Sequence, residues 1–333
     1  MSDWRIYRGD GTVASTPISD LPPPPPWRTF TGEGNASRPD DDGGEGNRRV
    51  GGMEHLRRVP QPEEVHLVNA SIQLRRPLLV TGDPGTGKSS LAYLIARELG
   101  LGPVLRWPVS SRTTLNNGLY LYDAIARVQA SADGTEPDIG DFIHLGPLGT
   151  ALLAADLPRV VLIDELDKGD IDLPNDLLNT FEEGEFEIDE LVRYSKRQSA
   201  VEVLTHDRGH TATVHNGLVR CREFPVIVIT SNGEREFPPA FLRRCLRLRV
   251  DRPNPQQLSA MVTAQFRGRE RTDTGRLIAE FLERSSEVGG LAADQLLNAV
   301  HLATRLATSG AYIPDEEWKE LLTAIWHPLA EPR

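Results

Sequence analysis

The sequence has few cysteines and no long apolar run. Only Cys221 and Cys245 occur among 333 residues, too few for a disulfide framework or a zinc site built from thiolates, so we expect buried thiols in a reducing compartment. No stretch approaches the roughly 20 apolar residues that span a bilayer, and no N-terminal pair of basic and apolar segments resembles a signal peptide. We therefore expect a cytoplasmic protein without a membrane partner.

Basic residues are also in the minority. Lys and Arg number 37 against 48 Asp and Glu, which gives a formal net charge of -11 at pH 7. Binding to nucleic acid or to an anionic membrane needs clustered basic side chains, so this balance argues against a general affinity for either. The length is sufficient for one large or two modest domains with a hydrophobic core.

The first 58 residues contain little that a core would bury. Five prolines at 22–26 precede Trp27, and a run rich in Gly and Asp follows at 31–52. Because few apolar groups offset the entropy of ordering, residues 1–58 are predicted to form a disordered Pro/Gly-rich arm. The prolines favour a stiff polyproline II rod, which is either a solvated spacer or a docking segment. In the second case the anchors are the surrounding aromatic residues, Trp4, Tyr7, Trp27 and Phe30.

Alternating strand and helix patterns follow the arm. A mostly helical run begins at Pro62, and the spacing of apolar residues then predicts buried strands at 77–81, 103–109, 160–164, 225–230 and 246–250. Strands that alternate with helices predict an α/β fold, with a five-stranded parallel sheet covered by helices on both faces. We place this domain at residues 59–251.

The strand patterns stop after residue 252. Apolar residues three or four apart predict three amphipathic helices at 277–282, 296–306 and 318–326. Residues 252–333 are therefore predicted to form a small, all-helical second domain.

Residues 82–89 read GDPGTGKS and match the phosphate-binding pattern G-x4-G-K-[ST] between a predicted strand and a predicted helix. Glycines let backbone N–H groups surround phosphate oxygens, and the helix directs its positive end at the same place. Lys88 is predicted to contact the β and γ phosphates of ATP, and Ser89 to supply a hydroxyl ligand to Mg²⁺. The predicted cofactor-binding residues are Gly82, Asp83, Pro84, Gly85, Thr86, Gly87, Lys88, Ser89, Ser90 and Asp164.

Polar residues end two of the other predicted strands. Asp164 and Glu165 close the run at 160–165, at the sheet edge where ligands bind in such folds. Asp164 fits a metal-holding role, mostly through water, and Glu165 fits a base that deprotonates the water attacking the γ-phosphate. Asn232 follows the strand at 225–230 and is predicted to position that water. The alternative is an ordinary strand end with solvated polar side chains.

In this order, the segments GDPGTGKS, LIDELDK, ITSN and FLRRC resemble those of the AAA+ ATPases over about residues 60–310. The chain is most similar to the MoxR type, because of VNASIQLRRPLLVTG before the loop, FIHLGPLGTALL before the acidic strand and PNDLLNTFEEGEFEI after it. The resemblance implies a P-loop domain with a helical lid, ATP hydrolysis with Mg²⁺, and a homo-oligomeric ring, usually hexameric. It also implies two insertions facing the ring axis: a hairpin at 138–145 and a second hairpin within 185–223.

The resemblance further implies an arginine of one subunit that reaches the γ-phosphate bound to the next. Arg243 and Arg244 follow a predicted short helix that begins with two prolines. Adjacent helical residues point about 100° apart, so the two guanidinium groups do not approach one phosphate in the same way. Alignment with family members that end in Leu-x-Arg favours Arg244. The alternative is a pair of surface arginines that steady a strand.

The predicted lid departs from the family pattern. Many relatives have an arginine there after a Gly-Ala-Ser-Pro run, whereas residues 290–295 read GLAADQ. Either Arg305 substitutes for this arginine, or the lid senses nucleotide by packing alone. No residue is assigned to the role.

Three uses of ATP remain open. The resemblance implies remodelling or chaperoning of a protein client, and such relatives often act with von Willebrand factor A domain proteins. The second interpretation is an ATP-switched signalling or assembly scaffold in a bacterial conflict or defence system. The third is a DNA-directed motor, which the acidic balance disfavours.

Overall fold

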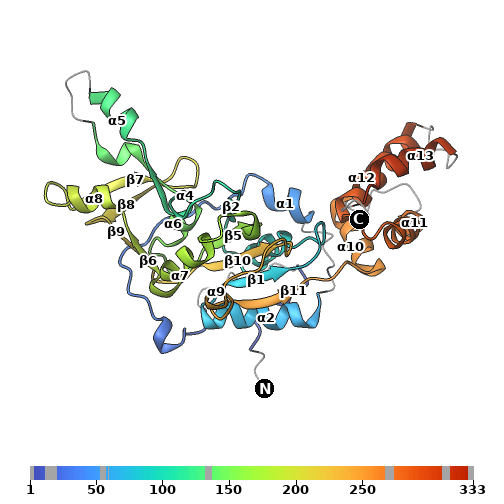
Figure 1. The fold of residues 1–333 in the computed structure, drawn as a ribbon, viewed down its shortest axis with the longest axis horizontal. Coiled ribbons are helices and arrows are strands. Elements are labelled where there is room, and N and C mark those ends of the chain that lie inside the picture. Colours follow the sequence, from blue (N-terminus) through green and yellow to red (C-terminus); the bar gives the residue numbers. More distant parts are fainter. Residues whose placement is uncertain are drawn as a thin grey trace.

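The computed structural model describes residues 4–11, 21–52, 58, 60–131, 137–266, 274–309 and 316–328. A central α/β body carries a second sheet on one side and a lobe of helices on the other (Figure 1). No helix within these ranges combines the length and the apolar composition that a membrane crossing requires.

The central sheet is parallel and has five strands. Its order is β11-β1-β10-β5-β2. The strands are β1 (Leu78–Thr81), β2 (Leu105–Pro108), β5 (Val160–Asp164), β10 (Val226–Ser231) and β11 (Leu246–Arg249). Each predicted apolar run forms one of them, so the predicted fold class is confirmed. β1, β10 and β5 are neighbours, and the residues after their carboxyl ends therefore converge at one edge.

Helices cover both faces of this sheet. Successive strand residues point to opposite faces, so Leu78 and Val80 join one core while Leu79 joins the other. The first core contains residues of α2 (Pro62–Leu74) and α3 (Ser90–Glu98), and the second contains residues of α7 (Leu173–Glu183) and α9 (Pro239–Leu242). The loop between β1 and α3 thus lies on a sheet that is rigidly packed on both sides.

Two insertions combine into one second sheet of six strands, in the order β3-β4-β7-β8-β9-β6. The first lies between α4 (Leu115–Leu119) and α6 (Pro147–Ala151) and contains β3 (Tyr120–Tyr122), α5 (Ala124–Ala130) and β4 (Ile143–Leu145). The second follows α7 and contains β6 (Glu185–Glu187), α8 (Asp189–Tyr194), β7 (Ala200–Leu204), β8 (Thr211–His215) and β9 (Leu218–Arg220). A single bridge between His144 and Leu204 joins β4 to β7.

The predicted hairpin at 138–145 is wrong in extent. Its second strand is β4, but the strand that pairs with β4 is β3, at residues 120–122. α5 and a 3-10 turn separate the two, so the pairing is not a local hairpin with a tight turn. The hairpin predicted within 185–223 is present, because β7 and β8 pair antiparallel over five positions.

The helical lobe, called the lid below, has its own apolar core. It consists of α10 (Pro255–Phe266), α11 (Thr274–Glu287), α12 (Ala293–Ser309) and α13 (Glu316–Ile325). The three predicted helices correspond to α11, α12 and α13. The prediction missed α10, in which Leu258 and Val262 are buried but most other positions are Gln, Ser, Thr or Ala.

The prediction of a disordered arm is wrong for the described part of residues 1–58. Tyr7 is fully buried and its hydroxyl donates a hydrogen bond to Glu64 Oε1 at 2.8 Å. The carboxamide of Asn69 binds the backbone of Tyr7 through both its oxygen and its nitrogen, and Glu98 accepts from the N–H of Gly9 at 3.0 Å. The segment is therefore held by buried polar groups of the domain, which a count of apolar residues does not register. Residues 1–3, 12–20 and 53–57 of the predicted arm lie outside the described residues.

The polyproline end of this segment is anchored through Arg28. Only 6% of Arg28 is exposed, and its guanidinium lies over the ring of Phe224 at 4.6 Å and that of Phe30 at 5.0 Å. The guanidinium also donates hydrogen bonds to the backbone oxygens of Arg75, Phe181 and Glu182. Of the four predicted docking anchors, Tyr7 and Phe30 pack within the chain, whereas Trp27 is 77% exposed and Trp4 49%.

Arg28→Ala is expected to lower the free energy of unfolding by about 2–4 kcal/mol, because three carbonyl oxygens lose a charged donor. Urea denaturation of the full chain measures this difference. Arg48→Ala is the control, because Arg48 is 72% exposed. If residues 21–39 were a free tether, Arg28→Ala would change stability by no more than about 0.5 kcal/mol.

Candidate active site

The loop at residues 82–89 connects β1 to α3, as predicted. Gly82, Gly85 and Gly87 have φ values of 151°, 74° and 83°, which side chains of L-residues rarely allow. A Cβ atom at Gly82 would lie 2.3 Å from the carbonyl oxygen of Val250, and one at Gly85 would lie 2.4 Å from the Cβ of Ala292. The glycines therefore provide both a backbone shape and the space that the loop needs between β11 and the lid.

Lys88 lies inside this loop. Its ammonium donates hydrogen bonds to the carbonyl oxygens of Gly82 at 2.8 Å and Asp83 at 2.7 Å. Burial lowers the pKa of Lys88, against the opposing attraction of nearby carboxylates, of which Asp167 has the largest effect. α3 begins at Ser90, so its positive N-terminal end faces the same loop. The loop thus gathers a cation, backbone N–H groups and a helix terminus around one small volume.

Asp164 is the centre of a hydrogen-bond network at the end of β5. Its Oδ1 accepts from Ser89 Oγ at 2.6 Å and from Thr230 Oγ1 at 2.9 Å, and its Oδ2 accepts from Arg106 Nη2 at 2.7 Å. Burial alone would raise the pKa of Asp164, but the hydrogen bonds from Ser89, Arg106 and Thr230 lower it below its ordinary value. This carboxylate is therefore ionised at neutral pH.

The pairing of Ser89 with Asp164 fits a magnesium site. A hydroxyl and an ionised carboxylate are hard oxygen donors, which Mg²⁺ prefers together with phosphate oxygens and water. Ser89 comes from the loop and Asp164 from the end of β5, and Ser89 Oγ lies 2.6 Å from Asp164 Oδ1. The predicted metal ligands are thus brought together.

Glu165 and Asn232 are also in contact. Asn232 Nδ2 donates to Glu165 Oε1 at 3.3 Å, and Lys168 Nζ lies 2.9 Å from Glu165 Oε2. Glu165 has a φ of 63°, a strained conformation for a residue with a side chain, and its N–H donates to Thr230 Oγ1 at 2.8 Å. The carboxylate remains 41% exposed and so is accessible to a water molecule.

Asp167 fixes the backbone that carries Asn232. It is only 3% exposed, and its Oδ2 accepts from the N–H groups of Asn232 at 2.9 Å and Glu234 at 3.0 Å. The sequence interpretation assigned no role to Asp167, Thr230 or Arg106. Three features of the sequence could have indicated these residues. Asp167 is the third acid within LIDELDK, Thr230 carries a hydroxyl at the end of an apolar strand, and Arg106 lies inside a short strand.

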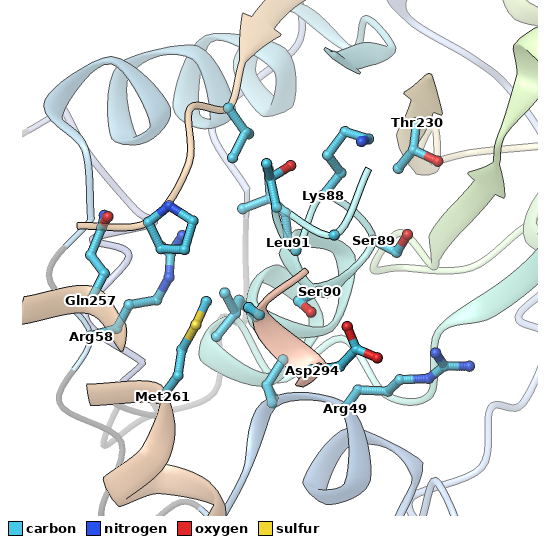
Figure 2. Close-up of a pocket in the computed structure, with 18 of the residues that line it drawn as sticks. Arg49, Arg58, Lys88, Ser89, Ser90, Leu91, Thr230, Gln257, Met261 and Asp294 are labelled. Atoms are coloured by element: carbon cyan, nitrogen blue, oxygen red, sulfur yellow. The ribbon is translucent and has the colours of Figure 1, made fainter. Parts of the chain in front are cut away.

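A cavity of about 410 Å³ lies beside the loop, within the range of small-molecule sites. Apolar walls come from three parts of the chain: Val50 before α2, Leu94 of α3, and Met261, Ala264 and Leu297 of the lid. Figure 2 shows Lys88, Ser89 and Thr230 gathered on one side of this cavity and Gln257, Arg58 and Met261 on the other. Polar groups thus gather beside the loop, whereas the opposite side combines the apolar Met261 with Gln257 and Arg58.

Of the predicted site residues, nine line the cavity: Pro84, Gly85, Thr86, Gly87, Lys88, Ser89, Ser90, Glu165 and Asn232. Gly82 and Asp83 belong to the same loop, and Asp83 forms an ion pair with Arg252 at 2.9 Å. Arg243 and Arg244 do not line the cavity. Arg244 Nε donates to Glu182 Oε1 at 2.5 Å, whereas the side chain of Arg243 is exposed.

A family model described as ATPase family associated with various cellular activities (AAA) matches residues 78–252. The matched range begins at β1 and includes the loop, Asp164, Glu165 and Asn232. The chain belongs to the AAA family. No curated protein matches the chain at a significant level. Membership implies nucleotide binding at the loop and ATP-driven activity, and members of this family usually assemble as rings.

Proposed function

We propose that the chain is a MoxR-like AAA+ ATPase that hydrolyses ATP with Mg²⁺ and acts as a ring, expected to be hexameric, on a partner protein. The observation that carries the hydrolytic part is the meeting of Glu165 with Asn232 beside the loop, at 3.3 Å. The MoxR-like part is supported by the insertion between α4 and α6 and by the second insertion before β10, both of which the resemblance implies.

The positions of the side chains support the following steps of hydrolysis. The backbone N–H groups of the loop bind the phosphates, and Lys88 contacts the β and γ phosphates. Ser89 and Asp164 would hold Mg²⁺, which would neutralise charge on these phosphates. Asn232 orients a water molecule, and Glu165 takes its proton as the water oxygen bonds to the γ-phosphorus. The bond between this phosphorus and the β–γ bridging oxygen breaks, which releases phosphate and leaves ADP.

The second sheet supports an action on protein. α5 lies at the end of the molecule away from the lid (Figure 1), and two of its large apolar side chains are exposed, Ile125 by 73% and Val128 by 72%. The two residues are three apart in the helix and so lie on one face, and contiguous exposed apolar surface is typical of protein contacts. We propose that this part of the ring contacts the client, or a von Willebrand factor A domain partner.

Phosphate release and light scattering on the full chain test this function. We expect ATP-dependent assembly together with turnover that rises when a client is added. Assembly with negligible turnover would instead support the scaffold interpretation, and turnover raised by DNA would support the motor.

Arg244→Ala is expected to reduce ATP hydrolysis by about 100-fold or more, because an arginine supplied by a neighbouring subunit stabilises charge on the transferring phosphoryl group. Mixing these subunits with Lys88→Ala subunits should restore activity, since the second variant donates Arg244 to ATP bound by the first. Arg243→Ala is the matched control and should keep most of its activity. Failure of the mixture to regain ATP hydrolysis would contradict action across an interface. A loss of hydrolysis confined to Arg243→Ala would assign the role to Arg243 instead.

A further inference from the structure

The lid contributes no basic side chain to the nucleotide cavity among the residues that the structure describes. α10 and α12 line it with apolar residues, with Gln257 and Gln265, and with Asp294 in the first turn of α12. Arg305 does not line the cavity. The lid therefore contributes an acidic side chain, Asp294, to a cavity that is expected to hold the negatively charged phosphates of a nucleotide.

The described basic residues that line the cavity are Arg49, Arg58 and Lys88. Lys88 belongs to the phosphate loop. Arg58 is engaged by Glu64, since both carboxylate oxygens of Glu64 accept from its guanidinium, one of them at 2.5 Å. Its charge is thus already neutralised by a buried acid.

Arg49 is engaged far more weakly. Its Nε is buried without a hydrogen-bond partner, and the nearest carboxylate oxygen, Glu45 Oε1, lies 3.6 Å away. That oxygen already accepts a hydrogen bond from Tyr93 at 3.0 Å and lies 3.5 Å from the competing guanidinium of Arg48. A buried donor that lacks a partner is costly unless a ligand satisfies it.

Arg49 lines the cavity and lies beside α3, the helix that follows the loop. It belongs to α1 (Glu45–Val50), and its guanidinium lies 5.8 Å from the ring centre of Tyr93. Tyr93 lies one turn after Ser89 along α3, so the two share one helix face. Figure 2 shows Arg49 on the same side of the cavity as Ser89, Ser90 and Asp294.

α1 is held at this place by both neighbouring elements. The N–H of Gly52 donates to the carbonyl oxygen of Ala264 in α10 at 3.1 Å, and Arg97 of α3 donates to the carbonyl oxygen of Gly51 at 2.9 Å. A Cβ atom at Gly51, where φ is 82°, would lie 2.7 Å from the same carbonyl oxygen of Ala264. The segment around Arg49 therefore bridges the α/β domain and the lid.

We propose that Arg49 binds the phosphates of the nucleotide and supplies the arginine that the lid lacks. A guanidinium group presents paired N–H donors that match phosphate oxygens. This inference rests on the proposed function, since it concerns the same nucleotide. The N-terminal segment, rather than the lid itself, then binds the phosphates. Phosphate binding is coupled to α10 through the contacts of Gly51 and Gly52.

The test compares nucleotide affinities of full-length variants by titration with ATP and with AMP in the presence of Mg²⁺. Arg49→Ala is expected to weaken ATP binding about 10- to 100-fold and AMP binding by much less, and Arg49→Lys to recover part of the loss. Arg48→Ala removes a solvent-exposed arginine of the same helix, and Arg305→Ala removes the alternative in the lid. Both should bind ATP within about twofold of the parent chain.

Three results would overturn the inference: ATP affinity unchanged in Arg49→Ala, an equal loss for ATP and AMP, or an equal loss in Arg48→Ala. The second would mean that Arg49 only shapes the cavity wall, and the third that any change in α1 disturbs the fold. Failure of the proposed function is distinguishable, because the parent chain itself would then not bind ATP.

Discussion

Glu165→Gln is expected to bind ATP as tightly as the parent chain and to hydrolyse it at least about 100-fold more slowly. The carboxamide keeps the size of the side chain and its contact with Asn232, but it does not accept a proton from water at neutral pH. Glu165 touches neither Lys88 nor Ser89 through any hydrogen bond in the described residues, so phosphate binding should be unaffected. Phosphate release and nucleotide titration measure the two effects separately.

Glu63→Gln is the matched control, because Glu63 is an exposed carboxylate in the first turn of α2. It should match the parent chain in both measurements. Normal turnover in Glu165→Gln would show that Glu165 is not the base. A parallel loss of ATP binding would show that its side chain acts mainly in positioning the loop. The ATP-bound variant should also accumulate as the assembled ring, which gives a trap for isolating the client.

Lys88→Ala is expected to weaken ATP binding about 10- to 100-fold, because a charged donor to the phosphates is lost. Lys88 is 7% exposed, and two carbonyl oxygens of the loop already accept hydrogen bonds from its ammonium. Little reorganisation is therefore required before it contacts phosphate. Titration of the variant with ATP measures the loss directly.

Lys196→Ala provides the control, since Lys196 is exposed and lies in the second insertion, away from the loop. The affinity of this control for ATP should equal that of the parent chain. An unchanged affinity in Lys88→Ala would contradict phosphate binding at residues 82–89, however well the glycines fit the loop.

The central sheet was predictable because its strands carry strong local signals. The five apolar runs are short, lie between helical patterns and form the five strands of one sheet. The loop and the acidic pair were predictable for a related reason: in a parallel sheet the carboxyl ends of β1, β5 and β10 meet at one edge, so residues distant in sequence converge.

Other parts of the site depend on contacts that local patterns do not contain. Thr230 and Arg106 act by approaching Asp164 from neighbouring strands, and strand order is needed to foresee such an approach. The segment before α2 was predicted to be disordered because it has few apolar groups. It is held instead by single buried partners such as Asn69, which composition does not reveal.

The pairing of β3 with β4 was missed for the same reason. β3 has only three residues, and a helix separates it from β4, so neither length nor turn chemistry indicates a strand there. Arg49 is a further example. Its place in the cavity follows from where α1 packs between α3 and α10, not from any motif around it.

Equilibrium dialysis of the full chain against labelled ATP with Mg²⁺ measures nucleotide binding at residues 82–89 directly. We expect saturable binding of ATP at one site per chain, which unlabelled ADP displaces and which Lys88→Ala weakens. Absence of saturable binding by a folded parent chain, at ATP concentrations into the millimolar range, would contradict nucleotide binding at this site.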